Sequence, residues 1–217
     1  MKILLADDMK SFLDLGRSFL SRAECELHTA ANGIEAVRLA LRLRPDLILL
    51  DIEMPEMTGI EACRIIKSNP DIASTPVIII TATDRMEDAR KAGADDFARK
   101  PIDEIKFLNL IKQHVKIKER YEPRVPFTAE IRLLNGLGEL AAVAQDLSPT
   151  GMAMKLPNPP LIGELLTARF AVPLSEGLQQ IQTSCIVVRY LDQGMAVRFY
   201  EMTSGASLAL QDFLLQA

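Results

Sequence analysis

Up to about residue 117, short apolar runs alternate with longer stretches of helical spacing. Leu47–Leu50 and Val77–Ile80 are apolar throughout, as are strands buried on both faces of a parallel sheet. We therefore expect a doubly wound (βα)5 parallel-sheet fold. The expected strands are Ile3–Ala6, Glu26–Ala30, Leu47–Leu50, Val77–Ile80 and Asp95–Ala98, and the expected helices are Ser11–Arg22, Gly33–Leu43, Gly59–Lys67, Arg85–Ala92 and Asp103–Lys118.

After Pro126 the pattern changes to short strands with two-residue alternation, clearest in Thr183–Arg189. Turn-forming pairs and Pro clusters separate these strands. The pattern predicts a small six-stranded antiparallel β-barrel with a C-terminal helix. The expected strands are Phe127–Leu134, Gly138–Asp146, Met152–Leu156, Leu165–Val172, Ile181–Tyr190 and Met195–Tyr200, followed by a helix at Gly205–Leu215.

The two sequence patterns meet in the stretch Lys116–Arg124. A chain of 217 residues is long enough for two domains of roughly 100 residues each, so we place them at residues 1–117 and 118–217. Pro126 cannot continue a helix. We therefore expect Lys116–Glu119 to end the last helix of the first domain.

Composition and charge narrow the function classes. The net charge of −4 is shared about evenly between the two halves, and neither half has the basic character of a nucleic-acid-binding surface, so DNA is an unlikely partner. Three widely spaced cysteines fit neither a disulfide framework nor a zinc site. No apolar run reaches the roughly 18 residues of a membrane span, and we expect a cytoplasmic protein.

Polar side chains follow four strands of the first predicted sheet. Asp7, Asp8, Asp51, Thr81 and Lys100 all fall at the carboxyl edge, where ligands of such sheets bind. Three carboxylates at one edge repel one another, and their oxygen atoms favour a hard cation such as Mg²⁺. With the charge offset by the cation and a lysine, one carboxylate oxygen can attack phosphorus.

These motifs resemble the receiver domain of two-component response regulators, over residues 1 to about 117. The resemblance implies phosphorylation by a sensor histidine kinase and a cis Lys100–Pro101 peptide bond. Phe97 fits a switch role and a plain core role equally well. The roles implied are Asp51 as phosphoacceptor; Asp7, Asp8, Asp51 and the backbone carbonyl of Glu53 as Mg²⁺ ligands; Lys100 as a contact of the phosphoryl group; and Thr81 with Phe97 as the conformational switch.

The second half carries paired arginines, Arg120 and Arg124, and the turn Asp146-Leu-Ser148-Pro-Thr-Gly151. Arginine suits phosphate oxygens and the O6/N7 edge of guanine, and aspartate can accept hydrogen bonds from guanine nitrogens. The two motifs together resemble the PilZ domain, a cyclic di-GMP receptor. The resemblance assigns Arg120 and Arg124 to phosphate and guanine contacts, and Asp146, Ser148 and Gly151 to a guanine-contacting loop.

The sequence thus predicts a bacterial response regulator whose PilZ output binds cyclic di-GMP and relays both signals to a downstream protein partner. It is not expected to be an enzyme, because the Asp51 chemistry turns over no external substrate. One alternative is a nucleotide-independent PilZ adaptor or scaffold for motility or secretion machinery, and a weaker one is a cyclic di-GMP-dependent transcription factor. Ligand stoichiometry and a homodimer remain open.

Overall fold

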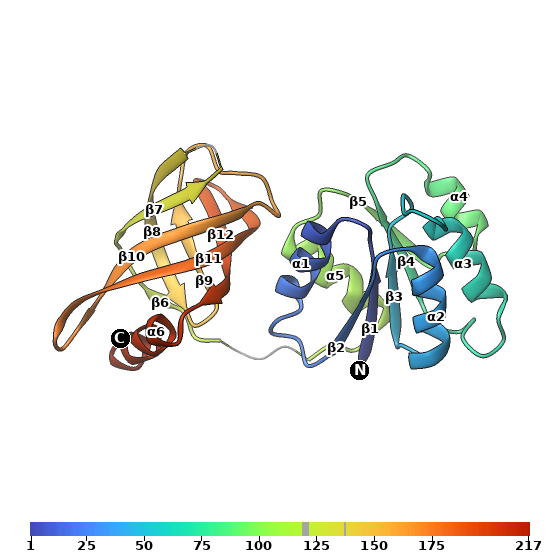
Figure 1. Cartoon of the computed structure of the whole chain (residues 1–217), viewed down its shortest axis with the longest axis horizontal. Coiled ribbons are helices and arrows are strands. Elements are labelled where there is room, and N and C mark those ends of the chain that lie inside the picture. The colour runs from blue at the N-terminus through green and yellow to red at the C-terminus, as the bar shows by residue number, and fades with distance from the viewer. Residues whose placement is uncertain (119–121, 137) are drawn as a thin grey trace. The chain divides into compact units, whose positions relative to one another are not determined.

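The computed structural model describes residues 1–118, 122–136 and 138–217. The chain divides into two units, Met1–Arg120 and Tyr121–Ala217, each with its own sheet (Figure 1). Arg120, one of the expected ligand contacts, lies outside the described residues, as does Glu119.

The first unit is the expected doubly wound parallel sheet. Its strand order is β2-β1-β3-β4-β5, and α1 and α5 lie on one face while α2, α3 and α4 lie on the other (Figure 1). The strands are β1 (Lys2–Ala6), β2 (Glu26–Ala30), β3 (Leu47–Leu50), β4 (Val77–Thr81) and β5 (Asp96–Arg99), and the helices are α1 (Lys10–Phe19), α2 (Gly33–Leu43), α3 (Gly59–Ser68), α4 (Met86–Lys91) and α5 (Glu104–His114).

Side chains at the helix starts fix several of these boundaries. Asn32 accepts a hydrogen bond from the Glu35 N–H at the start of α2, and Thr58 with Glu61 forms a reciprocal capping box at the start of α3. The strands β3 and β4 are fully buried, as their uniformly apolar sequences predicted. The Lys100–Pro101 peptide bond is cis, as the resemblance implied.

The end of α5 differs from the prediction. The helix ends at His114, and Val115 is extended, with φ −139° and ψ 149°. The backbone N–H of Glu24, in the connection from α1 to β2, donates to the carbonyl of Lys118 at 2.9 Å. This contact holds the segment after α5 against its own unit, so the expectation that Lys116 to Glu119 would end a helix is wrong for the residues that are described.

The second unit is an antiparallel sheet that closes on itself. The strand order is β6-β8-β7-β10-β11-β12-β9, and β9 pairs back to β8, so six strands form a closed ring that β6 extends. The strands are β6 (Val125–Pro126), β7 (Glu130–Asn135), β8 (Gly138–Ser148), β9 (Gly151–Lys155), β10 (Leu165–Leu174), β11 (Gly177–Leu191) and β12 (Gly194–Met202), and the closing helix is α6 (Ser204–Gln216).

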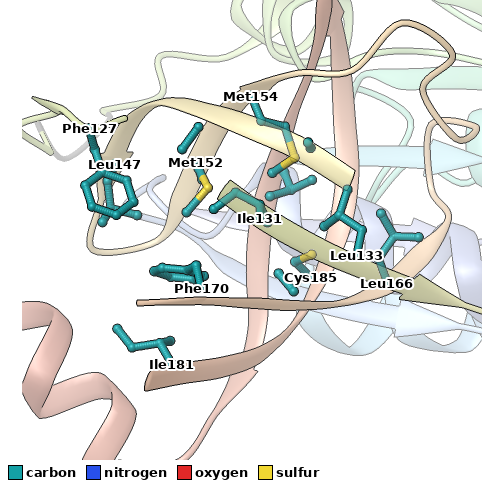
Figure 2. Close-up of a cluster of buried hydrophobic side chains, with 14 of the residues drawn as sticks. Phe127, Ile131, Leu133, Leu147, Met152, Met154, Leu166, Phe170, Ile181 and Cys185 are labelled. Atoms are coloured by element: carbon teal, nitrogen blue, oxygen red, sulfur yellow. The ribbon is translucent and has the colours of Figure 1, made fainter. Parts of the chain in front are cut away.

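The interior of this ring is an apolar core to which β7 to β12 and α6 contribute. Figure 2 shows Phe127, Phe170 and Ile181 near the helix, and Leu133, Leu166 and Cys185 further along the strands. The ring of Phe127 lies 5.3 Å from that of Phe213 on α6 and 6.2 Å from that of Phe170, measured between centroids. The helix thus closes one end of the core through aromatic contacts.

Two strand boundaries were not anticipated. The expected strand Phe127–Leu134 begins later, as β7 at Glu130, and the two-residue strand β6 (Val125–Pro126) comes before it. Between the two, Phe127 donates its N–H to the Gln145 carbonyl at 3.1 Å and buries its side chain in the core. The hairpin of β10 and β11 extends further than expected. Its outer part is exposed and mostly polar, so the sequence there has no apolar alternation from which a strand could be predicted.

In the described part of the chain, no helix is long and apolar enough to cross a membrane. The three cysteines are free thiols, as expected from their spacing. Burial raises the pKa of Cys63 to about 11 and that of Cys185 to about 12.

Candidate functional site

Three of the expected charged residues meet at the carboxyl edge of the parallel sheet. Asp7 follows β1, Asp51 follows β3 and Lys100 follows β5. The Lys100 Nζ lies 2.5 Å from Asp7 Oδ2 and 2.8 Å from Asp51 Oδ1. Both aspartates are buried, with relative exposures of 0% and 5%. A lysine is long enough to reach past β4, which separates β5 from β3, and bring its charge to both carboxylates.

The backbone holds both carboxylates in position. The Met9 N–H donates to Asp7 Oδ1 at 2.9 Å, and the Glu53 N–H donates to Asp51 Oδ2 at 2.7 Å. Gly59 lies so close to this loop that a Cβ there would be 1.9 Å from the carbonyl oxygen of Asp51. A glycine is therefore required where α3 begins beneath the site.

Two buried carboxylates share a single ammonium group, so the cluster is one positive charge short. Burial raises the pKa of Asp7 despite the opposing effect of its hydrogen bond and charge interaction with Lys100. Oxygen ligands with an uncompensated negative charge fit a hard divalent cation such as Mg²⁺.

The expected convergence of three carboxylates is not found. Asp8 is exposed, and among residues 1–118, 122–136 and 138–217 no three His, Cys, Asp or Glu side chains come together as metal ligands. Lys100 instead contacts both Asp7 and Asp51. Glu53 contributes its N–H to Asp51, and its side chain faces Arg85 at 3.4 Å.

Phe12 is a residue of this site that the sequence pattern did not reveal. The Lys100 Nζ lies 4.2 Å from the centroid of the Phe12 ring, within the range of a cation–π interaction. Phe12 is a buried residue of α1, so its place in the pattern is that of ordinary core. Only the spatial approach of Lys100 distinguishes it.

The two expected switch residues lie on adjacent strands. Thr81 ends β4 and is fully buried, and its hydroxyl lies 3.2 Å from that of Thr83. Phe97, on β5, is half-buried, and the Arg90 guanidinium carbon lies 5.3 Å from the centroid of its ring. Phe97 packs at the margin of the core, which is compatible with both roles considered for it.

In the second unit, Arg124 and Asp146 face each other directly. Arg124 donates to Asp146 Oδ1 from Nε at 2.9 Å and from Nη2 at 2.5 Å. The same oxygen accepts the Ala153 N–H at 3.1 Å. Each side chain is about one-third exposed, so both remain accessible to a ligand.

The rest of the predicted turn motif is held by local contacts. The buried Ser148 hydroxyl donates to the Gly151 carbonyl at 3.1 Å. A Cβ on Gly151 would lie 2.4 Å from the carbonyl oxygen of Val197 on β12. Gly151 therefore has a packing role between β9 and β12, whether or not it also approaches a ligand.

Beside this pair lies a polar chain that sequence reasoning missed. The Thr150 hydroxyl donates to a carboxylate oxygen of Glu122, and Arg198 Nη1 donates to Thr150 Oγ1 at 2.9 Å. Arg198 is only 6% exposed although it lies on β12. The one available signal was an arginine in the alternating segment Ala196–Phe199, on the face opposite Val197 and Phe199. These hydrogen bonds tie the segment that carries Arg124 to the barrel.

Comparisons with known proteins identify two domain families in this chain. The response regulator receiver domain model matches residues 3–112, and the PilZ domain model matches residues 118–216. The chain therefore belongs to the response regulator family and combines a receiver domain with a PilZ domain.

Similar curated proteins match the receiver half. PilG of Pseudomonas aeruginosa is 32% identical over 118 residues, which are 53% of this chain and 87% of that protein. The polar-differentiation response regulator DivK of Brucella anthropi is 32% identical over 52% of this chain and 94% of its own length. The response regulator PleD of Caulobacter vibrioides is 36% identical over 54% of this chain, but the match spans only 26% of PleD.

Two solved receiver structures show the same half of the fold. Chemotaxis protein CheY4 of Vibrio cholerae aligns with a TM-score of 0.50 and 28% identity, over 52% of this chain and 98% of that one. The receiver domain of a Pseudomonas aeruginosa sensor histidine kinase, described with a magnesium ion coordinated in its active site cleft, aligns with a TM-score of 0.50 and 28% identity. It covers 52% of this chain and 95% of that chain.

We predict that Lys100→Met destabilises the receiver unit by about 3–5 kcal/mol, because it leaves two buried carboxylates without their cation. Adding Asp51→Asn should recover part of that loss. Protonation relieves a carboxylate whose pKa is raised, so the loss should shrink as the pH falls from 8 to 5. Urea unfolding in EDTA measures both effects.

The matched control is Lys106→Met, because the Lys106 side chain is 76% exposed and faces Asp103 at 3.5 Å. This exposed pair should contribute less than about 1 kcal/mol. If the two lysine variants lose the same stability, Lys100 does not carry the buried charge.

Proposed function

We propose that the receiver unit is phosphorylated on Asp51 by a sensor histidine kinase. The observation that carries this is the approach of the Lys100 ammonium to both Asp7 and Asp51 at the carboxyl edge of the sheet. Asp51 Oδ2 is occupied by the Glu53 N–H, and we assign Oδ1, on the Lys100 side, as the attacking oxygen. A bond from Oδ1 to phosphorus forms as the bond from phosphorus to the donor breaks, and the donor nitrogen or oxygen leaves with its electron pair.

The residues around Asp51 prepare this reaction. The two backbone hydrogen bonds hold the carboxylates, and the ammonium of Lys100 offsets charge on the phosphoryl oxygens. Mg²⁺, when bound, would supply further positive charge to offset the negative charge of the phosphoryl group. Asp7 and Asp51 are the ligands that the geometry supports, while Asp8 and the backbone carbonyl of Glu53 follow from the family resemblance alone. Thr81 and Phe97 are proposed to respond to the phosphoryl group as the switch.

We expect acetyl phosphate with Mg²⁺ to add one phosphoryl group to the purified protein, and EDTA to prevent it. Asp51→Asn should abolish the addition because it removes the nucleophilic oxygen. Asp71→Asn serves as the control, since the Asp71 side chain is 70% exposed and faces only Arg44 at 3.8 Å among the ion pairs of the described chain. Intact-protein mass spectrometry reads the outcome, and an unchanged yield in Asp51→Asn would refute the assignment.

We further propose that the PilZ unit binds cyclic di-GMP. Arg124 and Asp146 bear opposite charges, are partly exposed and satisfy each other without a ligand. A guanine with its neighbouring phosphate offers an acceptor to the arginine and donors to the carboxylate. Contacts with the ligand can therefore replace the hydrogen bonds that Arg124 and Asp146 make with each other. Ser148 and Gly151 support the loop, and Arg120 is included on the resemblance alone.

Arg124→Ala should weaken cyclic di-GMP binding about 10- to 100-fold, because hydrogen bonds from a charged group contribute about 1.5–3 kcal/mol. Arg132→Ala is the matched control: it removes an exposed arginine of the same unit that ion-pairs with Glu139 at 3.5 Å. Isothermal titration calorimetry measures both. If wild-type protein gives no binding heat, the nucleotide-independent adaptor becomes the better proposal.

The two units together are proposed to relay phosphorylation and cyclic di-GMP to a protein partner in the cytoplasm, without catalysis on an external substrate. If the units are coupled, phosphorylation changes the Kd for cyclic di-GMP, and the nucleotide changes the receiver equilibrium by the same factor. We expect a change of about fivefold or more when the calorimetric titration is repeated on the phosphorylated protein. Equal Kd values in the two states would refute coupling while leaving both sites intact.

A further inference from the structure

A groove of about 920 Å³ lies on the PilZ unit, and its lining includes neither Arg124 nor Asp146. Residues of β7 and β8 form one side, and Lys155–Pro157 with Asp192 and Gln193 form the other. None of the residues assigned to phosphorylation or nucleotide binding lines it, so it calls for a separate explanation.

The strand register shows that β8 presents a free edge to this groove. The Ala144 N–H donates to the Ala129 carbonyl at 2.9 Å, so Ala144 points its backbone groups toward the β7 side. In an antiparallel pair these directions alternate along the strand. Glu139, Ala141 and Val143 therefore point their N–H and C=O groups away from β7, toward the groove.

Of these three residues, only Val143 is paired with a strand on the groove side. Val143 pairs with Lys155 of β9, and the pairing stops at that point. Because backbone directions alternate, the next residue after Lys155 to face β8 is Pro157, which has no N–H to donate. The N–H of the residue between them, Leu156, points the other way and donates to the Gln193 carbonyl at 3.1 Å. Among the described residues, no strand or loop pairs with the groove side of Glu139 or Ala141.

We propose that this slot binds one extended peptide segment of a partner protein, which adds to β8 as a short strand. The backbone groups of Glu139 and Ala141 supply two donors and two acceptors for it. Leu156, Pro157 and the turn residues Asp192 and Gln193 also line the groove, so a segment added to β8 would contact them as well. The proposed occupant is therefore a single extended chain and not the edge of another folded sheet.

The charges of the lining indicate the chemistry of that segment. Glu130, Glu139 and Asp192 stand against Arg132 and Lys155, and Arg132 ion-pairs with Glu139 at 3.5 Å. The surplus negative charge favours a peptide with at least one basic side chain. Val143, which is 42% exposed, and Leu156 and Pro157 offer apolar contacts to its neighbours. The slot would give the proposed relay a place to engage its partner, yet it requires neither phosphorylation nor cyclic di-GMP.

The test selects random heptapeptides displayed on phage against the full-length protein, with counter-selection against Ala141→Pro. The proline removes one donor from the slot but no hydrogen bond of the β7 ladder, because the Ala141 N–H points away from β7. We expect enriched peptides to contain β-branched residues and a Lys or Arg, and to bind wild type at least tenfold more tightly than Ala141→Pro. Synthetic versions N-methylated at alternate residues should lose at least tenfold in affinity.

A second variant keeps the test decisive if Ala141→Pro fails to fold. Glu130→Lys combined with Asp192→Lys should weaken the basic peptides at least fivefold, whereas Glu176→Lys, in a turn outside the lining, should not. Calorimetry with cyclic di-GMP on Ala141→Pro should be unchanged, which separates failure of the slot from failure of the nucleotide site. The proposal is overturned if no peptide distinguishes the variants, if N-methylated peptides bind equally, or if wild type dimerises through this edge in sedimentation.

Discussion

The contact of Lys100 with Asp7 and Asp51 is the constraint around which the receiver unit is arranged. It joins the ends of β1, β3 and β5, and it does so with buried charges that would be unfavourable without one another. The apolar strands of the sheet stabilise the fold enough to tolerate that cost. The deficit of one positive charge that remains would favour a divalent cation, and in the proposed reaction that cation and Lys100 would together offset the negative charge of the phosphoryl donor.

The PilZ unit also has a pair of opposite charges in contact, but at its surface. Arg124 and Asp146 are both partly exposed, and in the absence of ligand each neutralises the other. At the proposed nucleotide site this pair would oppose binding, because a ligand gains only the difference between its own contacts and those it replaces. The hydrogen bonds among Glu122, Thr150 and Arg198 tie the arginine-bearing segment to the barrel, so a ligand at the proposed site would have less chain entropy to overcome.

Much of this could be predicted from the sequence because the signals were local. Fully apolar runs identified β3 and β4, and residues placed directly after strands identified Asp7, Asp51 and Lys100. What could not be predicted depended on distance in space. The exposed position of Asp8, the ring of Phe12 beneath Lys100 and the burial of Arg198 each result from how elements pack, and none leaves a mark in spacing or composition.

The end of α5 shows how one tertiary contact changes a functional hypothesis. The largely helical spacing of this part of the sequence predicted a helix from Asp103 to Lys118, whereas the helix ends at His114. Instead Val115 is extended, and the Lys118 carbonyl accepts a hydrogen bond from the Glu24 N–H before β2. Because the Glu24 N–H holds the Lys118 carbonyl, a shift of the α1–β2 connection would move this stretch directly, so the proposed coupling between the units has a second starting point besides α5.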